Sequence, residues 1–563
     1  MAPFFVEWGS VKTMPLVLIF TAALLLRVFN LSAHPAGFHF DEANAGYNAY
    51  SIIKTGETLK NGAWPIYLNS FGDYRPMGVV YTMIPAVFLL GPTEFAVRFP
   101  IALFGALSPV LLFFLVKRLS GESPVSYMAA LLLALSPWHI NLSRATAEGV
   151  LAIFVSLSIF LVYVQIMARP TLRKAILMYL LMGISFITYH PVNLFLVVFM
   201  PISLLALWFL KKSGGRDVIK AGAVKLLLLV FMAYVIFPFL TGIFMGGATG
   251  RFGQVSISGA VIEHVERELG RVVPQQNDFL VRLFHNKIVD GVLLIGRQYA
   301  EYFSPKFLLF EGGPPARYQL PNAGLINIIE FLGLVFLAVN LWSSRRSRPV
   351  VFFVFWLLAA PLAAAITTED QPNVHRTILM IPAISVLAAF GLVGLFRAVP
   401  KKLGYKVVLA IAIAGALHYL YFFGQYFVHQ KYYEGLNRNY ASRDVARELA
   451  KIDKDRKILA TTYMLATDMY VLFFERIDPK IAQEAYAKSA DDRISFLNYT
   501  FTNKSECASE LDLHGVHVYD GYVDHYFCSL PADWKEILLS DPDGRGSVRI
   551  AKRAEFDNLG PTR

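Results

Sequence analysis

Hydrophobic stretches long enough to cross a lipid bilayer follow one another along most of the chain. A spanning helix needs about 20 mostly apolar residues, and we count about twelve such stretches before residue 430. The first, Met14 to Leu31, lacks a small-residue cleavage site and is expected to remain as a membrane anchor. The pattern predicts an α-helical polytopic membrane protein, with spans centred near Leu24, Pro85, Phe104, Leu131, Val155, Leu180, Leu196, Leu229, Val335, Phe355, Val386 and Ile413.

The pattern changes after residue 430, where charged positions become dense and mixed in sign. Ser442 to Ile452 has the apolar spacing of a helix, and three stretches resemble strands. At about 130 residues, this tail is long enough to bury its own core. We therefore predict a membrane domain over residues 1–430 and a soluble α/β domain over residues 431–563, with strands in Lys457–Tyr463, Gly515–Tyr519 and Ser547–Ala551.

The composition supports a membrane protein, with 55% hydrophobic and 17% charged residues. The net charge of +11 comes largely from alternate loops between the spans, which the positive-inside rule places in the cytoplasm. We therefore expect a multi-pass plasma-membrane protein with a cytoplasmic N-terminus, outer loops at 33–75 and 246–320 and an extracytoplasmic tail. Because membrane topology accounts for the excess positive charge, the charge implies no nucleic-acid partner. The basic loops contain Lys117 and Arg118, Arg173 and Lys174, Lys211 and Lys212, Arg345 and Arg346, and Lys401 and Lys402.

Both cysteines of the chain, Cys507 and Cys528, lie in the tail. In an oxidising outer compartment they are expected to form a disulfide, and two unpaired thiols are the alternative. A loop of this length would gain about 3 kcal/mol from the bridge in the chain-entropy model.

Asp41 and Glu42 stand side by side just beyond the first apolar span. Two carboxylates at a membrane edge are costly, and they call for a role. They begin a predicted amphipathic helix, Asp41 to Lys54. A structural alternative is that Asp41 is the N-cap and Glu42 a first-turn acid favoured by the helix dipole. Chemistry and capping are compatible, since a capped carboxylate is well oriented.

Basic residues are predicted on the same outer face. Arg75 precedes Pro76 at the start of the second span and offers a planar fork suited to phosphate. Arg144 and Glu148 are four residues apart in the second short outer loop, where Glu148 is a candidate for binding a metal or a substrate hydroxyl. Snorkelling of the arginine and a simple helical ion pair are the alternatives.

Histidines add further candidates on this face. His190 lies at an outer turn, and His375 and Arg376 precede an apolar helix, where either side chain is placed to face a phosphate. His285 falls in an amphipathic stretch, Phe279 to Phe303, of the second long outer loop. Taken alone, His190 is most often part of a polar turn, and snorkelling to lipid headgroups is the commoner explanation for His375 and for Arg376.

In this order, these parts resemble the dolichyl-phosphate-mannose protein mannosyltransferase superfamily. That superfamily includes bacterial lipid A aminoarabinose transferases and has the GT-C membrane fold. The resemblance covers roughly residues 14 to 430. It rests on Asp41-Glu42, Arg75-Pro76, the stretch from Pro92 to Gly105, Leu133-Ala-Leu-Ser-Pro-Trp-His-Ile, and Ser143-Arg144.

The resemblance implies a general base at Asp41, with Glu42 beside it, and a donor-phosphate contact at Arg75. Glu148 stands where relatives commonly have Asp, and His190 matches a basic position in relatives only loosely. The aminoarabinose branch has an acid before its basic residue, whereas this chain has Tyr74. A divalent cation, which would depend on that acid, is therefore left open.

The chemistry expected from these residues is sugar transfer. A sugar on polyprenyl phosphate has a good leaving group, so the acceptor hydroxyl needs a base and the departing phosphate needs cations such as Arg75 and Arg376. We expect an inverting hexosyl- or pentosyltransferase that uses a polyprenyl-phosphate-linked sugar and acts on a protein, lipid or glycan. Residues 246–320 would form a lid. A transporter and a non-catalytic sugar- or lipid-binding protein of the same fold are the alternatives.

Overall fold

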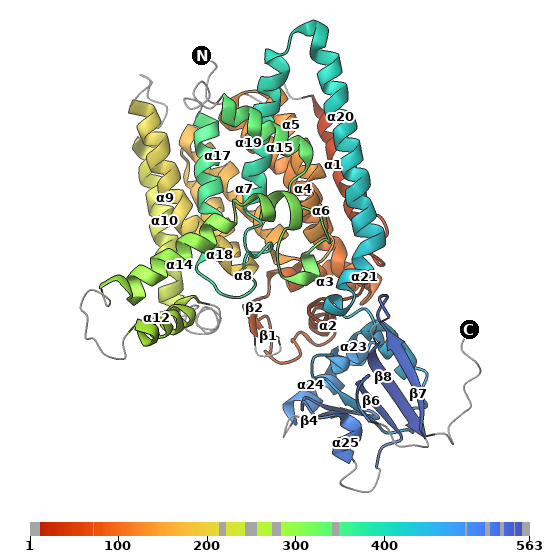
Figure 1. The fold of residues 1–563 in the computed structure, drawn as a ribbon. Helices are drawn as coiled ribbons and strands as arrows, with labels where there is room; N and C mark the ends of the chain where they lie inside the picture. The colour runs from red at the N-terminus through yellow and green to blue at the C-terminus, as the bar shows by residue number, and fades with distance from the viewer. Residues whose placement is uncertain are drawn as a thin grey trace. The chain divides into compact units, whose positions relative to one another are not determined.

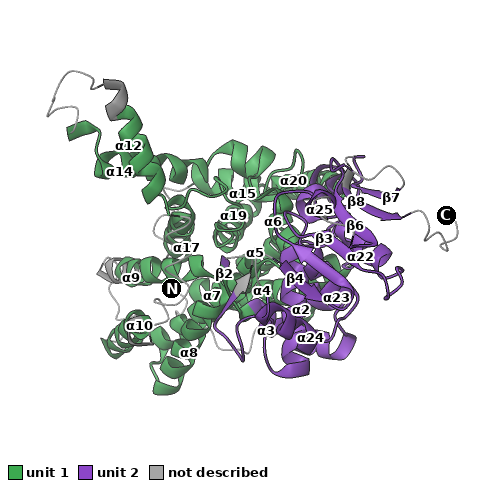
Figure 2. Cartoon of the chain, turned by 90° about the horizontal axis from the view of Figure 1, so that it is seen from below, with its two compact units in different colours: residues 1–29, 74–78, 101–425 green, residues 30–73, 79–100, 426–563 purple. Residues whose placement is uncertain are grey.

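The structure is a computed structural model, and it describes residues 12–70, 73–212, 221–241, 256–272, 283–340, 348–489, 493–512, 518–529, 534–544 and 546–553. The chain divides into two compact units, coloured separately in Figure 2. Unit 1 comprises residues 1–29, 74–78 and 101–425, and unit 2 comprises residues 30–73, 79–100 and 426–563. Unit 2 thus joins the tail to segments that the sequence analysis assigned to the membrane domain.

Unit 1 is built from apolar helices that run side by side (Figure 1). Two helices cross the boundary between the units in sequence: α3 (Gly78–Leu90) and α4 (Glu94–Ser120). The other helices of unit 1 are α1 (Thr13–Val28), α5 (Ser123–Leu135), α6 (Pro137–Ser143), α7 (Glu148–Ala168), α8 (Leu172–Thr188), α9 (His190–Lys212), α10 (Ala221–Thr241), α12 (Ser258–Val272), α14 (Lys287–Glu301), α15 (Ile328–Val339), α17 (Arg348–Ala359), α18 (Leu362–Ala365), α19 (Met380–Ala398) and α20 (Lys401–Gly424).

Every predicted span centre falls inside one of these helices. Among the described residues, five helices are long and apolar enough to cross a membrane. A sixth candidate arises if α5 and α6, which are bent by 53° relative to each other, form one span. Several other apolar helices are shorter, so the multi-pass character is clear and the number of spans stays a prediction.

Aromatic side chains fill the centre of unit 1. Phe160 of α7, Phe199 of α9 and Trp356 of α17 meet with ring centroids 4.9 to 5.3 Å apart. The indole nitrogen of Trp356 donates to the carbonyl oxygen of Leu379 at 2.7 Å. Because a buried indole N–H needs an acceptor, this bond lets a large ring occupy the core.

Two glycines bring α15 and α19 into backbone contact. A Cβ atom added at Gly391 would lie 1.8 Å from the carbonyl oxygen of Gly333, and one at Gly333 would lie 2.4 Å from that of Ala388. Small residues allow such close packing between helices in membranes, where van der Waals contact is a main source of association.

Unit 2 contains α2 (Phe40–Thr55) and a six-stranded sheet with flanking helices (Figure 2). Short strands β1 (Tyr67–Ser70) and β2 (Asp73–Pro76) lie between α2 and α3 along the chain. In the tail the order is α21 (Gln430–Glu434), α22 (Ser442–Leu449), β3 (Ile458–Thr461), α23 (Thr467–Phe474), α24 (Pro479–Ala487), β4 (Arg493–Phe496), β5 (Tyr499–Thr502), α25 (Ala508–Asp512), β6 (Gly521–His525), β7 (Trp534–Ser540) and β8 (Gly546–Arg553).

The sheet has the strand order β4-β5-β3-β6-β8-β7. The central strand β3 is buried along its length and pairs in parallel with β5 on one side and β6 on the other. This burial explains its continuous apolar sequence, since strands covered on both faces do not alternate. The predicted helix at Ser442 and the strands in Lys457–Tyr463 and Ser547–Ala551 are confirmed.

The predicted strand Gly515–Tyr519 is displaced in the structure. Residues 515–517 lie outside the described part, and Val518 and Tyr519 are not in a strand. The neighbouring strand is instead β6, whose first four residues are all buried. Apolar alternation at Val516 and Val518 suggested a strand six residues before β6, because β6 is buried on both faces and does not alternate.

The helix α2 packs against the tail within unit 2. Gly46 of α2 makes close contact with the tail, because a Cβ added there would lie 2.7 Å from a ring carbon of Phe473. The hydroxyl of Tyr47 donates to Ile477 O at 3.1 Å, and that of Tyr470 donates to Phe38 O at 2.6 Å. The first loop and the tail therefore share one core.

Candidate functional site

The helix carrying the two acids begins one residue before Asp41. His39 is its N-cap, and its Nδ1 accepts a hydrogen bond from the backbone N–H of Asp41 at 3.2 Å. The carboxylate of Glu42 accepts from the backbone N–H of His39 at 3.1 Å, which completes a capping box. The alternative that Asp41 is the N-cap is therefore wrong, while Glu42 is a first-turn acid.

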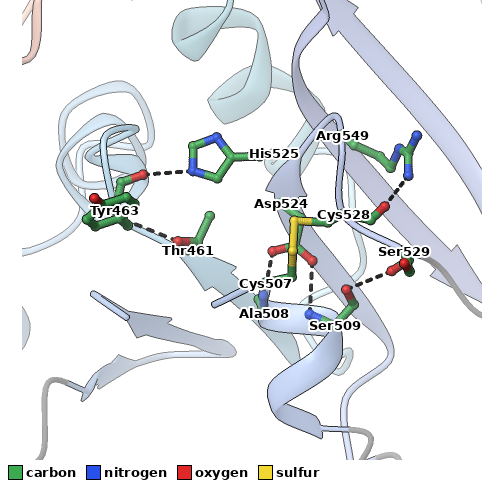
Figure 3. The surroundings of a disulfide bond; sticks show 10 residues. All are labelled: Thr461, Tyr463, Cys507, Ala508, Ser509, Asp524, His525, Cys528, Ser529 and Arg549. Atoms are coloured by element: carbon green, nitrogen blue, oxygen red, sulfur yellow. Dashed lines mark hydrogen bonds between the residues drawn. A yellow bond between two sulfur atoms is a disulfide. The ribbon is translucent and has the colours of Figure 1, made fainter. Parts of the chain in front are cut away.

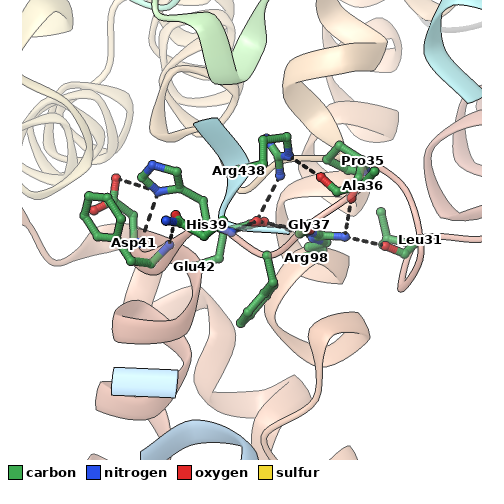
Figure 4. Close-up of polar contacts among 12 residues, drawn as sticks. Leu31, Pro35, Ala36, Gly37, His39, Asp41, Glu42, Arg98 and Arg438 are labelled. Atoms are coloured by element: carbon green, nitrogen blue, oxygen red, sulfur yellow. Dashed lines mark hydrogen bonds and ion pairs between the residues drawn. The ribbon is translucent and has the colours of Figure 1, made fainter. Parts of the chain in front are cut away.

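Glu42 is enclosed by two arginines (Figure 4). Its Oε1 lies 2.9 Å from Nε of Arg98, and its Oε2 lies 3.0 Å from Nη2 of both Arg98 and Arg438. The Glu42 side chain is only 3% exposed. Burial alone raises the pKa of a carboxyl, but the charges of Arg98 and Arg438 prevail and hold the pKa of Glu42 below its ordinary value.

The same arginines hold the loop that precedes α2. Arg98 donates to Leu31 O at 3.1 Å and to Gly37 O at 2.6 Å, and Arg438 donates to Ala36 O at 3.0 Å. Gly37 has a φ of 80°, and a Cβ there would lie 2.6 Å from the carbonyl oxygen of Arg438. Only glycine fits this position without strain. Figure 4 shows the carbonyl groups directed at the two guanidinium groups.

Asp41 lies at the edge of this cluster. Its Oδ2 is 3.3 Å from Nδ1 of His39, and its side chain is 16% exposed. The two neighbouring acids therefore differ: the carboxylate of Glu42 is enclosed by cations, whereas the Asp41 side chain is partly exposed and has one buried oxygen, Oδ1. This geometry supports Asp41 as a group that meets a substrate and Glu42 as a group that positions the loop and helix.

A second cluster lies in unit 1, where Glu148 is the first residue of α7. Its Oε2 is 3.5 Å from Nε2 of His375. The backbone N–H of Gly149 donates to the same Nε2 at 3.0 Å, and the hydroxyl of Tyr189 lies 3.3 Å from Nδ1. The rings of Tyr189 and His375 stack with centroids 4.7 Å apart. The structure thus brings together Glu148 and His375, which are far apart in the sequence.

The loop bearing His375 is fixed by its own polar groups. Asn373 accepts hydrogen bonds from the backbone N–H groups of His375 and Arg376 at 2.9 and 2.8 Å. The hydroxyl of Tyr302 accepts from the N–H of Asn373 at 3.1 Å. Arg376 donates to Thr367 Oγ1 at 2.9 Å and pairs with the carboxylate of Glu369. Its guanidinium is therefore held in place by the loop itself.

The contacts of Arg144 indicate a structural role. It follows α6, is fully buried, and donates to the carbonyl oxygens of Leu26, Arg27 and Phe29 at 2.8, 3.1 and 2.7 Å. These groups are the last carbonyls of α1, so Arg144 caps that helix and complements its dipole. Arg144 and Glu148 lie on opposite sides of a break between α6 and α7, not on one helix.

The remaining candidates are spread over separate elements. Arg75 lies in β2, and His190 is the first residue of α9, so it starts a helix instead of forming a turn. His285 precedes α14 and lies 3.7 Å from Asp290 through Nδ1 and Oδ1. The predicted amphipathic stretch Phe279–Phe303 contains α14, and its residues 279–282 are outside the described part.

Sequence reasoning missed His39, Arg98 and Arg438 around the acids, and Tyr189 and Tyr318 around His375. Arg98 offered a signal, because an arginine inside an apolar helix must find a buried partner. Tyr318 lies 5.2 Å from the ring of His375, centroid to centroid. Within the described residues, no group of three or more His, Cys, Asp or Glu side chains is placed to hold a metal ion.

Comparison with known proteins supports the predicted resemblance. Residues 75–241 match the family model described as dolichyl-phosphate-mannose-protein mannosyltransferase. An uncharacterized protein of Aquifex aeolicus is 27% identical over 148 residues, which are 26% of this chain and 29% of that relative. The chain therefore matches less than a third of that relative's length.

Solved structures share the fold. ArnT from Cupriavidus metallidurans bound to undecaprenyl phosphate matches with a TM-score of 0.53 and 13% identity, covering 98% of this chain and 100% of that chain. ArnT in the apo state matches with a TM-score of 0.51 and 14% identity, covering 98% and 99%. The alignments cover nearly the whole of both chains.

Proposed function

We propose that this chain, which resembles the dolichyl-phosphate-mannose-protein mannosyltransferases over residues 75–241 and shares the fold of ArnT, is an integral-membrane glycosyltransferase. It transfers a hexosyl or pentosyl group from a polyprenyl-phosphate donor to an acceptor hydroxyl on the outer face of the membrane. The observation that carries the proposal is the contrast between Glu42, whose two carboxylate oxygens are bound by arginines, and Asp41, whose side chain is partly exposed and faces no arginine in the contacts described above.

Asp41 is the general base. The acceptor oxygen attacks the anomeric carbon, the bond from that carbon to the phosphate oxygen breaks, and the hydroxyl proton passes to the Asp41 carboxylate. The electron pair of the broken bond leaves with polyprenyl phosphate. Direct displacement inverts the anomeric configuration. Glu42 is a positioning residue in this scheme, since both of its oxygens are bound by Arg98 or Arg438.

In unit 1, cationic and polar groups are proposed to bind the sugar donor. Arg75 and Arg376 are proposed to bind the donor phosphate, whose negative charge grows as the bond breaks. His375, fixed by Gly149, Tyr189 and Glu148, orients polar groups of the donor. His190 remains a weaker candidate for the phosphate, and the lid formed by residues 246–320 remains a proposal.

The proposed orientation has a cytoplasmic N-terminus and an extracytoplasmic tail. The distribution of Lys and Arg in the loops supports it. The disulfide between Cys507 and Cys528, with 5.7 Å between the two Cα atoms, supports an oxidising compartment for the tail.

Purified Asp41→Asn protein tests the proposal. Mannose, glucose and aminoarabinose, each linked to polyprenyl phosphate, are incubated in turn with the purified protein and a cell-envelope fraction. The release of polyprenyl phosphate that depends on the protein is measured. We expect the variant to lose turnover by about a hundredfold to ten-thousandfold while keeping its unfolding transition and donor binding. Wild-type turnover by Asp41→Asn refutes Asp41 as the base. If proteoliposomes transport a labelled sugar and no sugar is transferred to an acceptor, the proposal that the protein is a glycosyltransferase is refuted.

A further inference from the structure

The sheet of the tail has a topological switch point between β3 and β6. The three parallel strands stand in the order β5-β3-β6, so the chain leaves β3 for β5 on one side and later crosses to β6 on the other. In open α/β sheets, ligands bind outside the carboxyl ends of the strands at such a point. The carboxyl ends of β3 and β6 are joined by a hydrogen bond from His525 Nε2 to the carbonyl oxygen of Tyr463 at 3.1 Å (Figure 3).

Exposed aromatic side chains gather at this edge. Tyr463 follows β3, and Tyr526 and Phe527 follow β6, with exposed fractions of 41%, 52% and 68%. The rings of His525 and Phe527 stack with 5.2 Å between centroids and 4° between planes. Tyr463 stands edge-on to His525 at 6.5 Å. We call Tyr463, His525, Tyr526 and Phe527 the aromatic edge.

Hydrogen bonds and the disulfide hold the aromatic edge in place. Buried Asp524 accepts hydrogen bonds from the backbone N–H groups of Ala508 and Ser509 at 2.5 and 2.9 Å. Phe527 is followed by Cys528, whose disulfide to Cys507 fixes the turn, and Arg549 donates to Cys528 O at 2.5 Å (Figure 3). Rigid presentation of large exposed rings lowers the entropy lost on binding.

The turn after β3 is also under backbone strain. Met464 and Ala466 have φ values of 58° and 50°, a region that residues with side chains rarely adopt. Such strain clusters at sites that bind ligands. Met464 is 76% exposed, so packing does not account for its conformation.

The two turns of the edge lack the backbone of a phosphate site. Residues 462–466 and 525–529 contain no Gly, Lys or Arg, so neither turn forms a glycine-rich phosphate loop, although Lys504 follows Asn503 and Arg549 donates to Cys528 O. Thr462 and the exposed Asn503 add neutral hydrogen-bonding groups, with Thr462 Oγ1 lying 3.3 Å from Asn503 Oδ1. Flat apolar rings beside neutral polar groups match a sugar, whose faces present C–H groups and whose edges present hydroxyls.

We propose that the aromatic edge is a saccharide-binding site for a neutral oligosaccharide. A sugar ring stacks on the outer face of Phe527, whose other face is covered by His525, and its hydroxyls bond to Tyr463, Thr462 and Asn503. The site is separate from the residues proposed for sugar transfer, and its binding is measured without a lipid donor. Loss of transfer in Asp41→Asn therefore leaves this proposal unaffected.

Saturation-transfer NMR on the full-length protein in lipid nanodiscs tests the site, with mannotetraose, cellotetraose and chitotetraose as probes. We expect saturable binding of at least one probe. Phe527→Ala and Tyr463→Ala are each expected to weaken that binding by about fivefold or more, because the first removes the stacking face and the second removes a ring whose hydroxyl bonds to the sugar. Tyr433→Ala, which removes a 54% exposed ring from α21, is the matched control and is expected to bind as wild type does.

Three results would overturn the proposal. These are no saturable signal from any probe, equal binding by Phe527→Ala and wild type, and equal losses in Tyr433→Ala and Phe527→Ala. A tail that instead inserts into a bilayer is revealed by liposome binding that depends on Phe527 in the absence of saccharide binding. Because Phe527 is largely exposed, its truncation is expected to leave the disulfide and the unfolding transition unchanged, and both are measured for each variant.

Discussion

The carboxylate of Glu42 and the guanidinium of Arg98 meet as a two-point pair, with Nε 2.9 Å from Oε1 and Nη2 3.0 Å from Oε2. Both side chains are almost completely buried. A buried charge with one partner removed is costly, because neither water nor another charge compensates it. The pair also fixes the loop that sets the start of α2, so it links the stability of unit 2 to the placement of Asp41.

Replacing Glu42 with Gln is expected to lower the free energy of unfolding by about 3–5 kcal/mol, because Arg98 and Arg438 lose their counter-charge. Chemical denaturation in mixed micelles measures the change. Glu263→Gln is the control, since Glu263 and Arg267 form an exposed pair on α12 whose loss is expected to cost about 0.5 kcal/mol or less. Equal effects of the two substitutions would show that the buried pair contributes little.

The pKa of Glu42 is lowered in the folded protein, which predicts a specific pH dependence. An unfolded Glu has a pKa of about 4.3, so the stabilisation from Glu42 is fully present above that value. It is lost as the pH falls from there through the lower folded-state pKa. We expect the difference in unfolding free energy between wild type and Glu42→Gln to shrink below about pH 4.3. A difference that stays constant down to pH 3 would contradict this assignment.

His39 provides a test of how Asp41 is held. His39→Ala removes the N-cap of α2, which is expected to cost about 1 kcal/mol of stability and to lower the transfer rate, because Asp41 loses its orientation. His39→Asn restores a capping side chain and is expected to recover the stability. If the Asn variant also recovers transfer, His39 acts only as a cap; if transfer stays low, the imidazole itself positions Asp41.

Gly149 tests the placement of His375 without removing a functional group. A Cβ at Gly149 would lie 2.7 Å from Cγ2 of Ile378 and 3.0 Å from Cδ2 of His375. Gly149→Ala is expected to displace the histidine and weaken donor binding. Gly183→Ala in α8, where no atom lies within 4 Å of the added Cβ, is the control. Titration with a polyprenyl-phosphate sugar compares the two, and equal affinities would exclude a donor role for His375.

The disulfide is expected to stabilise the tail. Cys507 and Cys528 are separated by 21 residues, and the Cys507→Ser/Cys528→Ser double variant is expected to lose about 3 kcal/mol in the chain-entropy model. Unfolding of the tail is followed by limited proteolysis of the full-length protein. Wild-type protease resistance in the double variant would mean that the sheet holds the turn without the bridge.

The sequence predicted the helical elements well, because membrane-spanning helices are specified by local apolar runs. The centre at Leu131 falls in α5, but the break between α5 and α6 was not predicted, since it depends on Ser136 and Pro137 and not on hydropathy. In the tail, β3 was predictable from its apolar run. The strand β6 was misplaced because burial on both faces removes the alternation that marks a strand.

The candidate site was predictable only in part. The pairing of Cys507 with Cys528 followed from the number of cysteines and their compartment. The partners of Glu42 did not follow, because Arg438 is nearly four hundred residues away along the chain, with a separation of 396. Adjacent acids look alike in a sequence, and only the folded loop shows that Glu42 is neutralised and that Asp41 is partly exposed. The proximity of His375 to Glu148 is likewise a property of the helix packing.

The contact between Gly333 and Gly391 constrains where the proposed lipid donor can enter unit 1. With their backbones touching at these two glycines, α15 and α19 leave no room at this point for an isoprenoid chain, and no side-chain rotation opens one there. A lipid donor that enters laterally from the bilayer would therefore pass elsewhere than between these two glycines. A bulky residue at either glycine would push the two helices apart. Such a variant would test whether this close contact limits where the proposed lipid donor enters.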